Sequence, residues 1–67
     1  MSVINGVREY CIKQIGAYPA LETDIVGYFN LFMMEIEDGA ASEDHEAELL
    51  YDDVDTLIEE YKASLQN

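Results

Sequence analysis

The sequence predicts an all-α protein that folds as a three-helix antiparallel bundle, with helices at about residues 2–15, 19–38 and 43–65. Apolar residues recur at spacings of three and four, which places them on one face of a helix. No segment alternates with period two over the length of a strand. Two short glycine-containing turns, at residues 16–19 and 38–42, divide the chain, and helices joined by such turns run antiparallel. Because 67 residues suffice for one compact core, we expect residues 1–67 to form a single acidic helical domain.

The first expected helix, about residues 2–15, carries one apolar stripe. Its members are Ile4, Val7, Cys11 and Ile15. Gly16 can adopt the left-handed conformation that ends a helix, and Pro19 has the backbone φ favoured at the first position of the next one. We expect Cys11 to be a buried structural thiol because it lies on the stripe. A single cysteine forms no disulfide within the chain, which favours a reducing, cytoplasmic compartment.

The second expected helix, about residues 19–38, carries a longer apolar stripe. Its members are Leu21, Ile25, Tyr28, Phe29, Phe32 and Ile36. A helix start at Asp24, with Thr23 as the capping residue, is an open alternative.

Apolar and small residues of this segment also lie outside its stripe. They are Val26 and Met33 on one flank, Leu31 and Met34 toward the other, and Gly27 and Asn30 at the back. A helix in a three-helix bundle needs one apolar face, so the surplus predicts a self-association face made of these six residues, with a homodimer as its simplest product. The alternative is a wide core filled by flexible methionine side chains.

The third expected helix, about residues 43–65, has the clearest periodicity. Gly39 can close the preceding helix, and the hydroxyl of Ser42 can cap this one. Its apolar stripe consists of Ala47, Leu50, Tyr51, Val54, Leu57, Ile58, Tyr61 and Leu65.

The charge balance limits the partners that the chain can bind directly. Fifteen Asp and Glu residues stand against three Lys and Arg residues, for a formal net charge of −12. Contact with nucleic acid or with an anionic membrane requires basic residues, so we expect neither as a direct partner. The longest apolar run, residues 31–34, is far shorter than the roughly 20 residues that span a bilayer. Charged side chains within residues 1–16 argue against a signal peptide, so we expect a cytoplasmic protein.

The acids of the third helix form two stripes that flank its apolar face. The larger acidic stripe consists of Asp44, Glu48, Asp52, Asp55 and Glu59, and the smaller one of Glu46, Asp53 and Glu60. Like charges four residues apart on a helix cost about 0.2 to 0.5 kcal/mol per pair, so the larger stripe costs about 1 kcal/mol in total. Leu49 lies between the two stripes as an apolar side chain in a negative field.

These stripes support the hypothesis of a non-enzymatic acidic inhibitor that blocks the basic, nucleic-acid-binding surface of a partner protein. Acids four residues apart are separated by about 6 Å along a helix, similar to successive phosphates of one strand. Leu49 would anchor the centre of the interface. Such a protein suits a phage or mobile element and would act in the host cytoplasm, and an antitoxin-like neutraliser of a basic enzyme would use the same mechanism. The alternative interpretation is a solvated face with an ordinary exposed leucine.

A rival hypothesis from another class is a homo-oligomeric structural or assembly subunit that associates through residues 19–38. No residue pattern indicates an enzyme, a metal site or a cofactor. His45 is the only histidine, whereas a zinc site needs three or four ligands with Cys or His among them, so we expect an exposed histidine at a helix start. The chain also lacks a glycine-rich phosphate loop and a nucleophile elbow.

Overall fold

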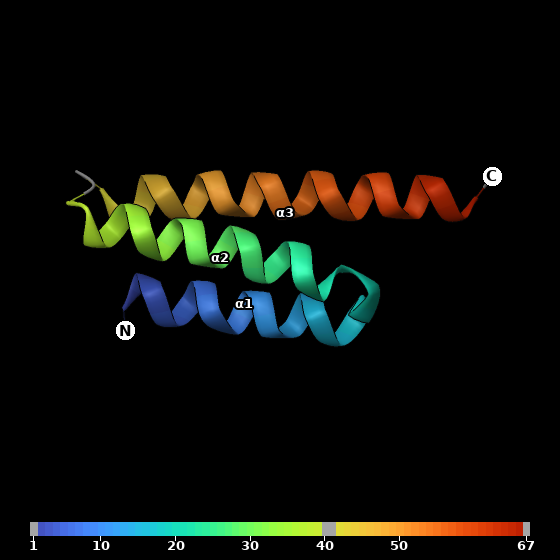
Figure 1. Cartoon of the computed structure of the whole chain (residues 1–67), viewed down its shortest axis with the longest axis horizontal. Helices are drawn as coiled ribbons and strands as arrows, with labels where there is room; N and C mark the ends of the chain where they lie inside the picture. Colours follow the sequence, from blue (N-terminus) through green and yellow to red (C-terminus); the bar gives the residue numbers. More distant parts are fainter. Residues whose placement is uncertain (1, 40–41, 67) are drawn as a thin grey trace.

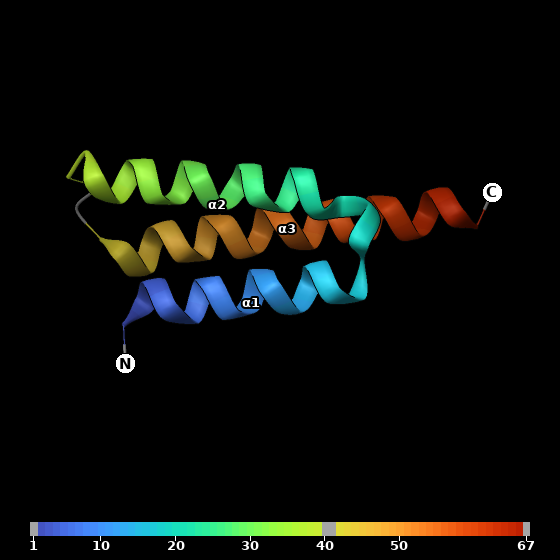
Figure 2. The same ribbon diagram turned by 60° about the horizontal axis from the view of Figure 1, so that its bottom comes forward.

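The computed structural model describes residues 2–39 and 42–66, and in these residues it contains three α-helices and no strand (Figure 1). The helices are α1 (Val3–Ala17), α2 (Glu22–Glu37) and α3 (Glu43–Leu65), and a short 3₁₀ helix, η1 (Pro19–Leu21), leads into α2. Successive helices run antiparallel, and each of the three contacts the other two (Figures 1 and 2). The predicted three-helix antiparallel bundle is confirmed.

The turn between α1 and α2 differs from the prediction. α1 continues through Gly16, and among the described residues Gly39 is the one glycine with a positive φ. The helix ends at Ala17, and the next residue, Tyr18, has a non-helical φ of −133° and ψ of 71°. A residue that precedes proline is disfavoured in the helical conformation, so Pro19 ends α1 and Gly16 does not. The alternative start of α2 at Asp24 was also wrong, because η1 carries the chain directly into a helix that begins at Glu22.

The turn between α2 and α3 confirms its two predicted signals. Gly39 has a φ of 92°, and its N–H donates to the carbonyl oxygen of Ile36 at 3.1 Å. The hydroxyl oxygen of Ser42 accepts a hydrogen bond from the backbone N–H of His45 at 3.2 Å, which caps α3. Ser2 caps α1 in the same way, through the N–H of Asn5 at 3.1 Å.

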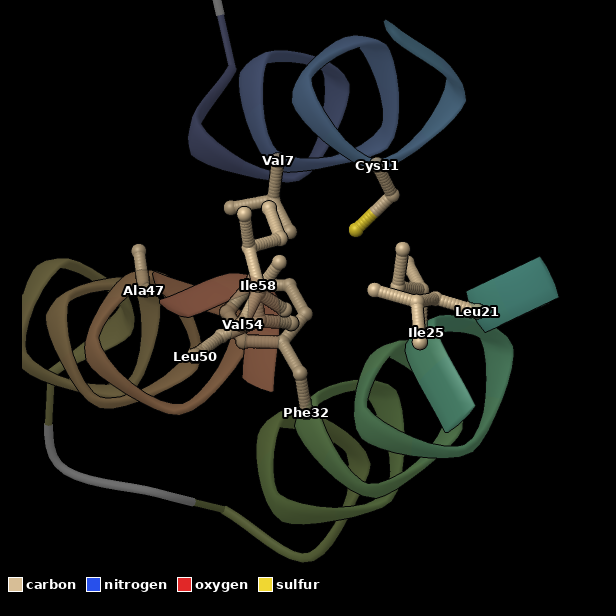
Figure 3. Packing of buried hydrophobic residues seen from close by; sticks show 9 residues of the cluster. All are labelled: Val7, Cys11, Leu21, Ile25, Phe32, Ala47, Leu50, Val54 and Ile58. Carbon is tan, nitrogen blue, oxygen red and sulfur yellow. The ribbon is translucent and has the colours of Figure 1, made fainter. Parts of the chain in front are cut away.

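The core consists of nine buried side chains that meet along the bundle axis (Figure 3). They are Val7, Cys11, Leu21, Ile25, Phe32, Ala47, Leu50, Val54 and Ile58. All nine belong to the predicted apolar stripes, so helical periodicity identified the core-facing side of each helix. Complete burial of one aliphatic side chain contributes roughly 1.5 to 3 kcal/mol relative to leaving it in water.

The carboxyl end of α3 extends past the other two helices (Figures 1 and 2). α3 has 23 residues, whereas α1 has 15 and α2 has 16. Near the end of the bundle the ring of Tyr61 packs edge to face against Tyr18, with ring centroids 6.0 Å apart. Leu65, predicted to lie in the core, is 68% exposed because no neighbouring helix extends that far. That prediction was wrong.

Candidate protein-binding surface

The larger acidic stripe lies on the flank of α3 that is nearer to α1. Its five acids are all exposed. Tyr51, at the edge of the stripe, packs edge to face against Tyr10 of α1 with ring centroids 4.7 Å apart. Burial raises the pKa of Tyr10 above its ordinary value of 10.0, and the negative charge of nearby Asp55 raises it further. The stripe therefore forms an open, strongly negative surface with two tyrosine rings beside it.

The smaller acidic stripe borders a groove between α2 and α3. The groove has a volume of about 340 Å³, and α2 contributes Tyr28, Leu31, Phe32 and Glu35 to its lining, while α3 contributes Glu46, Leu49, Leu50 and Asp53. We call it the α2/α3 groove. Glu60, the third member of the smaller stripe, is exposed farther along α3 and does not line the groove.

Apolar side chains remain accessible at the middle of the α2/α3 groove. Leu31 is 56% exposed and Leu49 is 46% exposed. Because α2 and α3 run antiparallel, Glu35 and Glu46 share the end of the groove near the α2–α3 turn. Asp53 and Tyr28 share the other end. Leu49 is thus not an isolated apolar side chain, because it lies across a groove from Leu31.

The six residues predicted to form a self-association face are distributed over several surfaces. Met33 is partly buried and packs against the core, as in the alternative interpretation. Val26 lines a small apolar hollow of about 120 Å³ between α1 and α2, which Ile12 and Arg8 also line. Leu31 lines the α2/α3 groove on the opposite side of α2. Gly27, Asn30 and Met34 are exposed.

Three residues of these surfaces were not predicted from the sequence, namely Glu35, Tyr28 and Ile12. Glu35 borders the α2/α3 groove, and Tyr28 lines it although it lies on the predicted core stripe. Their spacing of seven residues along α2, with Leu31 between them, was a signal that they share a flank. Ile12, at 62% exposure, is the largest apolar contribution of α1 to the surface.

Cys11 and His45 lie where the sequence predicted them. Cys11 is a free thiol in the core, and burial raises its pKa above 9.0, so it remains protonated and unreactive at neutral pH. His45 is exposed in the first turn of α3. Within residues 2–39 and 42–66, no cluster of three or more His, Cys, Asp or Glu side chains is placed to hold a metal ion.

Comparisons with protein-family models, with curated proteins and with solved structures found no match to this chain. In the described part of the chain, no helix combines the length and the apolar character needed to cross a membrane.

Proposed function

We propose that this protein is a non-enzymatic acidic binding protein that masks a basic surface of another protein, ordinarily one used to bind nucleic acid, through α3. The partner would place lysine and arginine side chains against carboxylates that stand where phosphates otherwise bind. Such a protein would suit a phage or mobile element that disables a host nucleic-acid-binding protein, and an antitoxin-like neutraliser of a basic enzyme would use the same contact.

The observation that supports the proposal is that Leu49, an accessible apolar side chain, lies among acids on the solvent-facing side of α3. Acidic charge alone also serves solubility, so a partner is indicated by what lies among the acids and not by their number. Here α3 carries nine acids and one lysine, and its acids flank Leu49 on both sides. Interfaces gain most of their affinity from apolar anchors in the centre and gain specificity from a charged rim. Leu49, with the acids around it, has that arrangement.

The charge of the larger acidic stripe is the property to test. The stripe variant carries Glu48→Gln, Asp52→Asn, Asp55→Asn and Glu59→Gln. The control variant carries Glu22→Gln, Asp24→Asn, Glu37→Gln and Asp38→Asn. Each removes four carboxylates, so the formal net charge changes from −12 to −8 in both. The control changes lie on α2 and its carboxyl end, away from the stripe.

The tagged wild-type chain and both variants are used to purify partners from cells of the native host. We expect a protein with a basic surface to co-purify with the wild type and the control variant and to be lost with the stripe variant. The purified partner should lose binding to nucleic acid when wild-type chain is added. Equal capture by all three chains, or capture with no effect on the partner's nucleic-acid binding, would contradict the proposal.

A second candidate function, self-association as an assembly subunit, is favoured by apolar surface on α2 away from the acids of α3. Met34 is 56% exposed and Val26 is 42% exposed. Sedimentation equilibrium at micromolar concentration should then detect a dimer or larger species, and Met34→Glu should dissociate it. A strict monomer at these concentrations would exclude this function.

A further inference from the structure

The α2/α3 groove has an apolar middle and acidic ends, and this order along the groove follows from the antiparallel helices. Leu31 and Leu49 border the middle, above the buried side chains of Phe32 and Leu50. Glu35 and Glu46 lie at one end, and Asp53 lies at the other. A ligand that fills the groove therefore meets negative charge, then apolar surface, then negative charge again.

A second copy of this chain does not have the charge to fill the groove. The formal net charge of −12 makes close approach of two copies unfavourable wherever their acids face each other. The three basic residues are Arg8 and Lys13 on α1 and Lys62 near the end of α3. Arg8 donates a hydrogen bond to Asn5 within α1, and the amine of Lys62 lies 5.8 Å from the centre of the Tyr18 ring. The occupant has to supply positive charge and apolar side chains together.

The spacing of the groove residues indicates the secondary structure of the occupant. Glu46 and Asp53 are seven residues apart on α3, which corresponds to about 10 Å along the helix axis. A partner helix that lies along the groove presents its residues i and i+7 about 10 Å apart, the same separation as Glu46 and Asp53. Its residues i+3 and i+4 lie between them on the same face. Amphipathic helices bind grooves in this way, through apolar side chains at these positions.

We infer that the α2/α3 groove binds a basic amphipathic helix of the partner, with lysine or arginine at positions i and i+7 and bulky apolar residues at i+3 and i+4. The apolar pair packs between Leu31 and Leu49. The two basic residues meet the acids at the two ends, Glu35 with Glu46 and Asp53. This inference rests on the proposed function and specifies the partner's binding element.

Two synthetic helical peptides test the inference. Both are alanine-based and contain two lysines at i and i+7; the matching peptide has leucines at i+3 and i+4, and the mismatched peptide has them at i+2 and i+5, on the opposite face. We expect the matching peptide to bind the full chain at least about tenfold more tightly, which corresponds to about 1.4 kcal/mol. Backbone amide signals of the groove residues should shift in nitrogen-15 NMR spectra on its addition.

Variants of the full chain locate the contact. Leu31→Ala with Leu49→Ala should weaken the matching peptide about tenfold or more, and folding should be unaffected because both side chains are substantially exposed. Ile12→Ala with Val26→Ala, in the hollow on the other side of α2, is the matched control and should leave the affinity unchanged.

Different experimental results would contradict the groove inference and the proposed function. Equal affinity for the two peptides, or no binding of either, would overturn the groove inference, and so would an unchanged affinity in the Leu31→Ala, Leu49→Ala variant. If the stripe variant still loses the native partner in that case, the proposed function stands without the groove. The matching peptide could instead bind tightly at the groove while the stripe variant captures the native partner as well as the wild type does. That result would support the groove inference and contradict charge masking by the larger stripe.

Discussion

Neutralising the larger acidic stripe should stabilise the fold as well as abolish binding. The stripe variant removes three like-charge pairs at a spacing of four residues, namely Asp44 with Glu48, Glu48 with Asp52, and Asp55 with Glu59. Each pair costs about 0.2 to 0.5 kcal/mol, so their removal should raise the free energy of unfolding by about 1 kcal/mol. Gln and Asn have helix propensities close to those of Glu and Asp, so the change in intrinsic propensity is small. The acids are exposed, so no packing is lost.

Thermal unfolding followed by circular dichroism measures this effect. For a domain of this size, about 1 kcal/mol corresponds to a rise in Tm of roughly 4 to 8 °C. The rise should be largest at low ionic strength and should disappear near 1 M salt, where the Debye length falls to about 3 Å, below the separation of about 6 Å between paired acids.

The control variant separates the stripe from net charge. It removes Glu22 and Asp24, which are favourable in the first turn of α2, and Glu37 and Asp38, which are unfavourable at its carboxyl end. These effects on the helix dipole nearly cancel, so the stripe variant should exceed the control variant by about 1 kcal/mol at the same formal charge. Equal Tm values for the two variants at low salt, or a stripe variant less stable than wild type, would refute the claim that the stripe opposes folding.

Three further predictions concern the fold. Gly27→Ala should raise the free energy of unfolding by about 0.5 to 1 kcal/mol, because Gly27 lies in a helix interior where an added Cβ meets no atom within 4 Å. Gly39→Ala should lower the free energy of unfolding by about 1 kcal/mol, because its φ of 92° is unfavourable for a residue with a Cβ. Urea denaturation measures both changes. Stability should fall as pH rises above 9.0, since the Cys11 thiol ionises at its ordinary pKa when unfolded and at a raised pKa when folded; Tyr10 adds to the fall above 10.0. Denaturation midpoints across this pH range should show a smaller fall in Cys11→Ala. Ile25→Val should lower stability by about 0.5 to 1.5 kcal/mol in thermal denaturation, because Ile25 is fully buried.

Features that depend on neighbouring residues alone could be predicted from the sequence. Ser42 caps α3 and Gly39 closes α2 because each acts on backbone groups within a few residues. Gly16 shows how two local signals compete. Its conformational freedom permits a helix end, but Pro19 imposes one through the residue that precedes it. The stronger steric restriction prevails, so α1 ends at Ala17, directly before Tyr18, and not at the glycine.

The error at Leu65 arises because periodicity describes one helix at a time. Leu65 continues the apolar stripe of α3 in phase, yet burial needs a second helix at the same height along the bundle. The predicted segment lengths already indicate that the last residues of the third helix have no helix beside them, since the third segment is longer than either of the others. Its carboxyl end therefore extends beyond its neighbours (Figure 1).

The α2/α3 groove could not be predicted because it depends on the handedness of the bundle. Both flanks of α2 carry apolar residues, with Val26 on one and Leu31 on the other, and both flanks of α3 carry acids. Periodicity fixes the face that points to the core but not which flank adjoins which neighbour. In the structure Leu31 lies beside α3 and Val26 beside α1. In a bundle of the opposite hand, Val26 would lie beside the larger acidic stripe, and Leu31 and Leu49 would both face α1. Leu31 and Leu49 face each other between acids because the bundle has this handedness. The binding specificity inferred for the groove is therefore a property of the tertiary arrangement and not of any one helix.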